Sequence, residues 1–226
     1  MRKTAIIATL LISFVINAQT KPNSKMFKKS YKEKVLTKQE DGFNEFFDPK
    51  NNLYSNYRYG LSFDAPNNWK KDYGVSEHTI FRAFEQDSAI SFFINVLEFK
   101  DELAGKDEKN IWEIYSEDKI KFDTIFTKTH SKSLKTEIYN FKVTKSYIDN
   151  NISLKITFST ITKELDYEYE TYYLIHQLYR NNKMITFGLT VPILIYNLDK
   201  IYFEELFLKI RLFEEKKINI KKKKNE

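Results

Sequence analysis

The sequence predicts an α+β domain built on a single antiparallel β-sheet of about six or seven strands flanked by helices, as an α/β/α sandwich. Three observations lead to this prediction. Apolar and polar residues alternate with a period of two over several long stretches between residues 57 and 191. Short turns rich in Asn and Asp join neighbouring stretches, which favours antiparallel pairing. Two further segments have helical spacing, so strands and helices are not regularly alternated as in a doubly wound parallel fold.

The first elements follow a stretch with three phenylalanines, "GFNEFFDPKNN", which we expect to form a short helical turn that ends before Pro49. Tyr57–Asp64 is the first predicted strand, because Tyr59, Leu61 and Phe63 alternate with smaller or polar residues. Pro66 ends this strand, since proline cannot donate to a ladder. The second and third predicted strands are Thr79–Phe84 and Ala89–Phe99.

The remaining predicted elements are two helices and four strands. Residues 107–126 have charges between apolar residues at helical spacing, which predicts a helix. Four strands should follow, in two pairs joined at "IDNN" and "RNNK": Thr136–Tyr147, Ile152–Thr162, Tyr167–Tyr179 and Met184–Val191. Residues 197–213 predict a final helix, with Asn197 as its cap and Asp199 at the positive end of its dipole.

The N-terminus has the pattern of a secretory signal peptide. Arg2 and Lys3 precede an apolar run from Ala5 to Ile16, and Ala18 supplies a small residue for cleavage. The run is shorter than the roughly 20 residues that span a membrane. We therefore expect a cleaved signal peptide over residues 1–18, no membrane span afterwards, and a secreted or periplasmic protein. The absence of cysteine excludes a lipid anchor on a cysteine, a thiol nucleophile and a Cys-based zinc site.

The positive charge of the chain lies in its ends. Once the leader (+2), residues 20–42 (+4) and residues 216–226 (+5) are removed from the total of +6, the remainder carries a net charge of −5. We therefore predict a lysine-rich linker over residues 19–42, one domain over residues 43–215 and a disordered basic tail over residues 216–226. A defined phosphate-binding groove needs cations on a folded surface, so we expect no specific nucleic acid as a partner.

The stretch from Tyr59 to Trp69, "YGLSFDAPNNW", resembles the motif that opens domains of the PsbP-like/Mog-like superfamily. The residues that carry the resemblance form a structural motif of Tyr59, Gly60, Phe63, Pro66 and Trp69. The predicted order of elements over about residues 53–213 is similar as well. The superfamily includes a photosystem-associated subunit, a binder of a small GTPase and many exported bacterial domains. The resemblance implies an α/β/α sandwich and a non-enzymatic binding or assembly module. We expect Trp69 to cover the core.

Motifs for catalysis and cofactor binding are absent from the sequence. There is no G-x-S-x-G elbow, and the five glycines are too scattered to form a phosphate-binding loop. We therefore predict no catalytic, cofactor-binding or metal-binding residues, and no cofactor.

The strand Tyr167–Tyr179 is the candidate for a ligand groove. By parity, Glu168, Glu170 and His176 share one face, while Tyr167, Tyr169 and Tyr173 share the other. Glu170 and His176 are about 20 Å apart along a strand, which is too far for one metal ion, so we expect His176 at the surface. The candidate groove residues are Tyr167, Glu168, Tyr169, Glu170, Tyr173 and His176.

Three functions stay open at this point. The first is an exported, non-enzymatic module that binds an unknown protein or small ligand in the cell envelope. The second is a carboxylate-dependent hydrolase with its site near residues 167–170, where acidic side chains cluster. The third is a loose binder of anionic surfaces through the lysine-rich ends.

Overall fold

The computed structural model describes residues 45–72, 76, 78–86, 88–99, 110–164 and 167–215. The predicted signal peptide, the lysine-rich linker and the basic tail lie outside the described residues. Among the helices in these ranges, none has the length and apolar character needed to cross a membrane.

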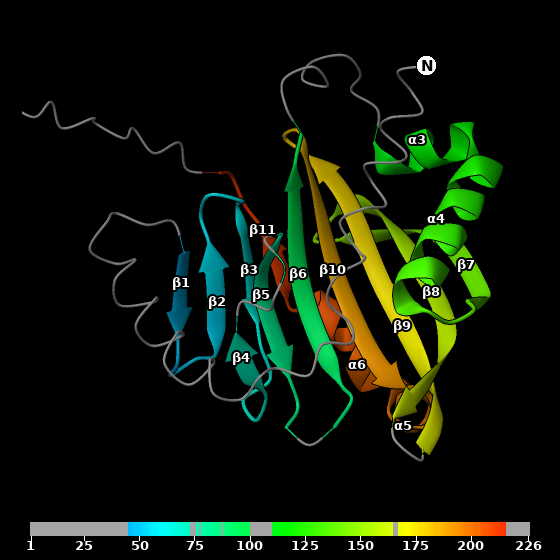
Figure 1. Cartoon of the computed structure of the whole chain (residues 1–226). Coiled ribbons are helices and arrows are strands. Elements are labelled where there is room, and N and C mark those ends of the chain that lie inside the picture. The colour runs from blue at the N-terminus through cyan, green and yellow to red at the C-terminus, as the bar shows by residue number, and fades with distance from the viewer. Residues whose placement is uncertain are drawn as a thin grey trace, which may run out of the picture.

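The described chain forms two antiparallel sheets and four helices (Figure 1). The helices are α3 (Ile111–Glu117), α4 (Lys119–Leu134), α5 (Ile193–Leu198) and α6 (Lys200–Leu208). The large sheet has seven strands in the order β4-β5-β6-β10-β9-β8-β7, and the small sheet has four in the order β1-β2-β3-β11. The strands of the large sheet are β4 (Lys70–Asp72), β5 (Thr79–Phe84), β6 (Ser91–Glu98), β7 (Tyr139–Ile148), β8 (Asn151–Glu164), β9 (Tyr167–Arg180) and β10 (Lys183–Pro192). Those of the small sheet are β1 (Glu45–Asp48), β2 (Leu53–Asn56), β3 (Leu61–Asp64) and β11 (Ile210–Leu212).

The α+β class and the antiparallel seven-stranded sheet confirm the prediction, and the small sheet adds to it. The predicted strand Tyr57–Asp64 contributes β3, which belongs to the small sheet. Leu61 and Phe63 of β3 are fully buried against the large sheet, and the ring of Phe63 stacks on Phe92 of β6 at 4.3 Å. The alternation thus correctly gave a strand with one buried face, but it could not say which sheet the strand joins.

Within the stretch "GFNEFFDPKNN", residues Glu45–Asp48 form strand β1, so the prediction of a helical turn there was wrong. Residues 45–48 pair with β2 in a hairpin. Asp48 holds the turn, because its carboxylate accepts hydrogen bonds from the Lys50 amide at 2.9 Å and from Asn51 Nδ2 at 2.8 Å. Asn52 then adopts a φ of 53°, which asparagine tolerates at low cost. Pairing with β2 outweighs the weak local tendency of these four residues to turn.

The two long hairpins of the large sheet follow the predicted turns. Asp149 and Asn150 have φ values of 44° and 65°, and Asn181 and Asn182 have 49° and 58°. Positive φ at both central residues is what a two-residue hairpin needs to match the twist of its strands. These turns fix the register of β7 with β8 and of β9 with β10.

The predicted helix over residues 107–126 is two helices that begin and end later. Asn110 caps α3: its side chain accepts from the amides of Trp112 and Glu113, and the Glu113 carboxylate accepts from the Asn110 amide. This reciprocal capping box explains why α3 begins at residue 111. The chain bends at Asp118, and α4 continues to Leu134.

The C-terminal helix begins earlier than predicted and is also divided. Pro192 ends β10 and directly precedes α5, where its fixed φ suits the start of a helix. Asn197 therefore lies inside α5. The prediction that it caps the helix was wrong. Asp199 precedes α6 without a capping side-chain hydrogen bond, and the predicted helical end at residues 210–212 is the strand β11.

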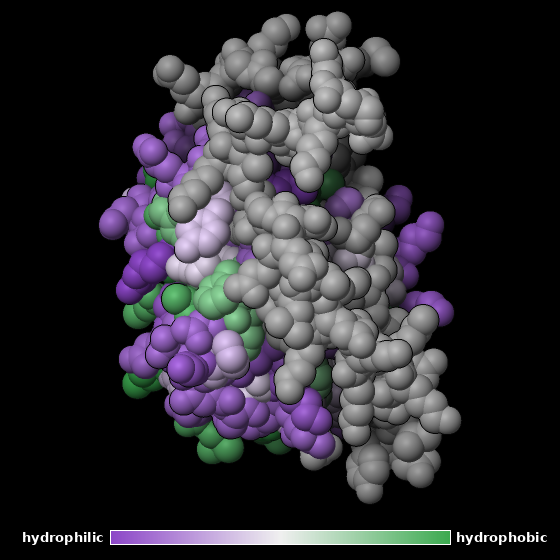
Figure 2. Space-filling model, turned by 90° about the vertical axis from the view of Figure 1, so that its left-hand side faces the viewer, coloured by the Kyte–Doolittle hydropathy of each residue, from purple (hydrophilic) through white to green (hydrophobic). Residues whose placement is uncertain are grey.

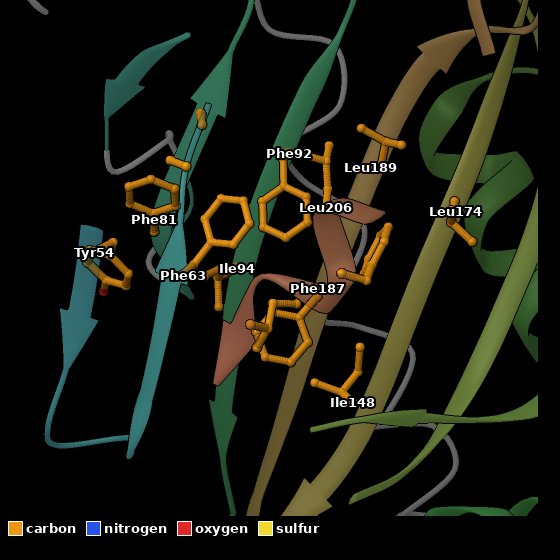
Figure 3. Close-up of a cluster of buried hydrophobic side chains, with 14 of the residues drawn as sticks. Tyr54, Phe63, Phe81, Phe92, Ile94, Ile148, Leu174, Phe187, Leu189 and Leu206 are labelled. Atoms are coloured by element: carbon orange, nitrogen blue, oxygen red, sulfur yellow. The ribbon is translucent and has the colours of Figure 1, made fainter. Parts of the chain in front are cut away.

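The core consists of two clusters, one on each face of the large sheet. On one face, the small sheet and helices α5 and α6 cover the larger cluster, which includes Phe81, Phe92 and Phe187. Figure 3 shows these rings pointing toward Tyr54 and Phe63 of the small sheet and toward Leu206 of α6. On the other face, α3 and α4 cover a second cluster that contains Phe122, Phe126 and Phe158. The layers are thus two helices, the large sheet, and a mixed layer of small sheet and helices.

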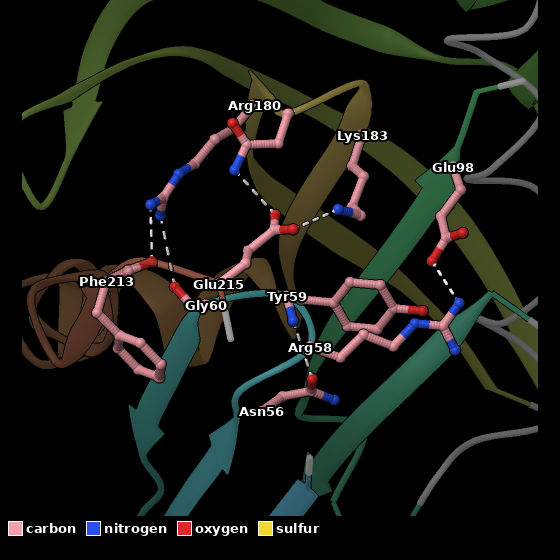
Figure 4. A network of polar contacts seen from close by, with 10 residues as sticks. Asn56, Arg58, Tyr59, Gly60, Glu98, Arg180, Lys183, Phe213 and Glu215 are labelled. Atoms are coloured by element: carbon pink, nitrogen blue, oxygen red, sulfur yellow. Dashed lines mark hydrogen bonds and ion pairs between the residues drawn. The ribbon is translucent and has the colours of Figure 1, made fainter. Parts of the chain in front are cut away.

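The motif Tyr59–Trp69 contacts the C-terminal end of the described chain. Gly60 has a φ of 60°, and its carbonyl accepts a 2.8 Å hydrogen bond from the Phe213 amide. Arg180 donates to the Phe213 carbonyl at 2.7 Å, and Figure 4 shows these groups converging with Glu215. Phe63, Pro66 and Trp69 are buried, and Trp69 belongs to the larger core cluster. Half-buried Tyr59 packs against that cluster, and burial raises the pKa of its hydroxyl to about 12.

Candidate functional site

Strand β9 carries the six candidate groove residues but does not bring them together. Tyr167 opens the strand opposite Glu164, and Tyr169 is half-buried. Glu168 is exposed, and its carboxylate forms a 3.2 Å ion pair with Lys163. Half-buried Glu170 lies near Tyr139, where burial and this carboxylate raise the pKa of the Tyr139 hydroxyl.

The other two candidates, Tyr173 and His176, lie in the core. The Tyr173 ring stacks on Phe158 at 4.4 Å in the cluster under the helices, and burial raises its pKa to about 12. His176 is buried on the opposite face of the sheet, so the expectation of a surface histidine was wrong. The reason is tertiary: α6 lies over this part of β9 and places Phe207 against the imidazole at 4.6 Å.

Ionisable side chains gather around His176 on this face. Lys155 of β8, which pairs with His176 in the ladder, forms an ion pair with Glu204 of α6 at 2.6 Å. The Tyr196 hydroxyl of α5 donates to the same carboxylate at 2.9 Å, and the Tyr196 ring lies 4.2 Å from that of Tyr172. The cluster thus ties helices α5 and α6 to strands β8 and β9.

Burial and neighbouring charges shift the pKa values of His176, Glu204 and Tyr196 in this cluster. Burial lowers the pKa of His176 to about 3, and the positive charge of Lys155 acts in the same direction. Burial alone would raise the pKa of Glu204, but hydrogen bonding and attraction from Lys155 outweigh it and lower the pKa. Burial, Tyr172 and the Glu204 carboxylate raise the pKa of Tyr196 well above its usual value. Near neutral pH the cluster therefore contains a neutral imidazole, a neutral phenol and one ion pair.

One contact in the cluster has the composition of a nucleophile and its base. The Ser153 hydroxyl lies 3.2 Å from His176 Nδ1, within the range of a hydrogen bond. Both side chains are buried, and neither faces a surface that a substrate could reach. The contact is therefore a hydrogen bond inside the core that links β8 to β9, and a substrate has no access to it for acyl transfer.

The structure brings together residues that sequence reasoning did not combine. Lys155 and Glu204 are 49 positions apart, and only the packing of α6 on the sheet makes them neighbours. Alternation in β8 did place Ser153 and Lys155 on one face, which is the only local signal for the cluster. Over the described ranges, no group of three or more His, Asp or Glu residues could hold a metal ion.

The outer face of α5 and α6 carries large aliphatic side chains that contact little else. Four residues, which we call the α5–α6 stripe, are exposed by 75%, 87%, 74% and 68%: Leu194, Leu198, Ile201 and Leu208. Their inward neighbours Tyr196, Phe203, Leu206 and Phe207 are buried in the core. Figure 2, a view from the small-sheet side, shows a surface that is mostly hydrophilic where residues are coloured. Aliphatic groups this exposed and this close in sequence are typical of contact surfaces.

Comparison with known proteins finds similarity in fold. No protein-family model matches the chain, and no curated protein of similar sequence was found. Among solved structures, the chain is similar to the cyanobacterial PsbP (CyanoP) of Synechocystis, with 16% identity and a TM-score of 0.47. The similarity covers 71% of this chain and 91% of that one.

A second similar structure comes from Bacteroides thetaiotaomicron, with 14% identity and a TM-score of 0.43. It covers 76% of this chain, which spans about half (49%) of that one. At these identities the likeness concerns the fold alone.

Proposed function

We propose that this chain is an exported, non-enzymatic binding or assembly module that contacts a protein partner in the cell envelope through the α5–α6 stripe. One observation carries the proposal: four large aliphatic side chains on two adjacent helices face solvent while the inward faces of the same helices are fully packed. Burying such side chains against a partner releases their hydration water and stabilises the complex.

The arrangement of ionisable groups supports binding more than catalysis. Glu168, an acid of the hydrolase hypothesis, is exposed and paired with Lys163. A general acid needs a site that encloses it, and the exposed side chain of Glu168 lies in no such site. The Ser153–His176 contact is buried, as described above. The signal-peptide pattern in residues 1–18 supports the location of the module outside the cytoplasm.

The test is a quantitative pull-down from the envelope fraction of the exporting cell, with the purified full-length protein as bait. The Leu198→Glu/Ile201→Glu double variant should capture at least about tenfold less of any specific partner than the wild type does. The reason is that burying an unpaired charge at an apolar contact is strongly unfavourable. Ile120→Glu is the matched control, since Ile120 is 82% exposed on the distant helix α4. Equal capture by the double variant and the wild type would contradict a role for the stripe.

A further inference from the structure

We infer that the outer face of α4 is a docking surface for an anionic lipid membrane. The inference goes beyond the proposed function, from which it takes only the location in the cell envelope. It draws on the net charge of one segment, on a row of lysines along α4, and on the place of this row in the fold.

The positive charge of the folded domain is concentrated in one segment. Residues 119–145 contain seven lysines against Asp123 and Glu137, which gives a net charge of +5. Residues 43–215 as a whole carry −5, so the rest of the domain carries −10 once this segment is subtracted. The segment forms α4 and most of β7, which pack together through Phe126 and Phe141 with their ring centroids 5.1 Å apart. The domain is therefore acidic on average but basic on one side.

Three of these lysines form a row along α4, which we call the α4 lysine row: Lys121, Lys128 and Lys132. They are separated by seven and four residues within one uninterrupted helix, so their side chains leave the same side of it. The buried side chains of α4 are on the opposite side: Phe122, Phe126 and His130. The row extends over about 16 Å of the helix axis. Lys135 follows directly as the exposed C-cap of the helix.

Few acidic groups neutralise this face. Lys128, Lys132 and Lys135 are exposed, and none of them forms an ion pair with an acidic side chain of the described ranges. Lys121 has the Asp118 carboxylate at a loose 3.7 Å. Like charges gathered on one surface repel one another, and an anionic partner relieves that repulsion. The face is thus complementary to a partner with a high density of negative charge.

The shape and chemistry of the face favour a lipid surface over a nucleic acid. Figure 1 shows α4 lying over β7 and β8, so the row is on the outer side of a helix, and such a convex surface can meet a plane. A nucleic-acid strand is instead bound in a basic groove with aromatic side chains that stack on its bases. Arginine suits specific phosphate recognition, yet the chain has none between Arg82 and Arg180. Lysines act as point charges, which suits a diffuse anionic surface.

The edge strand β7 adds a cation and an aromatic ring on the same side of the sheet. Lys145 and Tyr147 pair with Leu154 and Ile152 of β8, which belong to the cluster under the helices. Both side chains therefore lie on the helix side. Tyr147 is 57% exposed, and Lys145 Nζ lies 6.0 Å from the centre of its ring. Tyrosine is enriched at membrane–water interfaces because its ring is apolar and its hydroxyl is polar.

The α4 lysine row and the α5–α6 stripe are on opposite faces of the large sheet. Helices α3 and α4 cover one face, and α5 and α6 cover the other together with the small sheet. A domain that docks on lipid through α4 would therefore hold the stripe away from the membrane. The stripe would stay available to the protein partner of the proposed function.

The first experiment measures co-sedimentation of the full-length protein with vesicles of phosphatidylcholine, with and without one third phosphatidylglycerol. The wild type should bind the anionic vesicles more tightly, and this difference should shrink as the salt is raised from about 0.05 M to about 0.3 M. Lys128→Gln/Lys132→Gln/Lys135→Gln should bind them on the order of a hundredfold more weakly, because each lysine near such a surface contributes about fivefold.

The matched control removes the same charge elsewhere. Lys50→Gln/Lys200→Gln/Lys209→Gln changes three exposed lysines outside α4 and β7, and its vesicle binding should stay within about threefold of the wild type. Both variants keep the lysine-rich ends of the chain, so their difference reports the row alone. Circular dichroism and urea unfolding check that each variant is folded.

A second measurement reports which face meets the lipid. The chain contains no cysteine, so Thr124→Cys on the exposed side of α4 and Leu198→Cys in the stripe can each carry one fluorophore. Anionic vesicles with nitroxide-labelled headgroups should quench the Thr124→Cys probe at least about twofold more than the Leu198→Cys probe, because quenching requires close approach to the headgroups. Each probe reports its own surroundings, whatever else holds the chain on the vesicle.

The outcomes separate this inference from the proposed function. Equal vesicle binding by the row variant and its control would overturn the inference, as would equal quenching of both probes or stronger quenching at the stripe. A row variant that loses binding to a short DNA duplex but not to anionic vesicles would replace the lipid by a nucleic acid and overturn it too. The pull-down tests the stripe independently, because its variants leave every lysine of the row in place.

Discussion

The amide of Phe213 donates a 2.8 Å hydrogen bond to the carbonyl oxygen of Gly60, across 153 positions of sequence. Gly60 adopts a φ of 60°, and a Cβ built on it would overlap the carbonyl oxygen of Phe213. This contact fixes the end of β11 beside the start of β3, and Arg180 reinforces it from β9 (Figure 4). The glycine of the Tyr59–Trp69 motif is therefore required by the approach of a distant backbone segment.

Gly60→Ala should lower the free energy of unfolding by about 2–4 kcal/mol. Left-handed φ costs a non-glycine residue about 1–2 kcal/mol, and the overlap with the Phe213 carbonyl adds a cost of similar size. Urea unfolding followed by tryptophan fluorescence measures the change. Ser62→Ala, two residues further along, should change stability by less than about 0.5 kcal/mol. A Gly60→Ala protein as stable as the wild type would mean that the two segments do not approach this closely.

Gly188→Ala should destabilise the protein, and shortening Phe93 should rescue much of the loss. These residues pair across β10 and β6, and a Cβ on Gly188 would overlap the ring of Phe93. We expect a cost of about 1–3 kcal/mol for the single substitution. In a double-mutant cycle with Phe93→Leu, the two costs should be clearly less than additive. Additive costs in urea unfolding would argue against direct contact.

Removing one partner of the ion pair between Arg82 and Asp72 should destabilise the protein strongly, whereas replacing both partners by apolar residues should destabilise it little. Arg82 Nε and Nη2 bind the two carboxylate oxygens at 2.8 Å and 2.6 Å, and both side chains are about 9% exposed. Arg82→Met or Asp72→Leu alone leaves a buried charge and should cost about 3–5 kcal/mol. The double variant should recover most of this loss, because an apolar pair needs no desolvation of charge. Thermal unfolding of all four proteins tests the cycle, and a double variant worse than either single variant would refute it.

Stability should fall as the pH decreases from about 6.5. Burial lowers the pKa of His176 to about 3 and that of His130 to about 4, whereas both would be near 6.5 in the unfolded chain. In the interval between, the unfolded state binds protons that the folded state does not bind. Each histidine should thus lower the free energy of unfolding by about 1.4 kcal/mol per pH unit, and its full contribution is present only above the unfolded pKa.

The His176→Gln variant should make the pH dependence shallower by about one proton. Glutamine cannot be protonated in this range but can still hydrogen-bond to Ser153, so the fold should be retained. Urea unfolding at pH 4.5, 5.5 and 7.5 gives the slopes for both proteins. Identical slopes for the variant and the wild type would show that His176 is not kept neutral by the fold.

Lys135→Gly should stabilise the protein by about 0.5–1 kcal/mol. Lys135 is exposed at the end of α4 and has a φ of 55°, the conformation in which glycine commonly ends helices. The gain from removing this strain exceeds the extra entropy of glycine in the unfolded chain. Lys132→Gly, inside the last turn of the same helix, should instead destabilise by about 1 kcal/mol. A stability change of the same sign in both variants would contradict the assigned conformations.

Local patterns predicted the long strands well and the short ones poorly. Strand β8 and the hairpin turns at residues 149–150 and 181–182 follow from alternation and from the tolerance of Asn and Asp for positive φ. Strands β1, β4 and β11 have only three or four residues, which is too few to show a period. They exist because neighbouring strands pair with them.

The sequence by itself determined the antiparallel α+β class, the alternation that buries one face of each long strand, and the turns that set their register, because these depend on residues close together in the chain. Only the tertiary structure decided that β3 and β11 form a second sheet, that His176 is buried beside Lys155 and Glu204, and that the α5–α6 stripe stays exposed. Each of these depends on which segment packs over which face, and that choice is made by contacts between residues tens of positions apart.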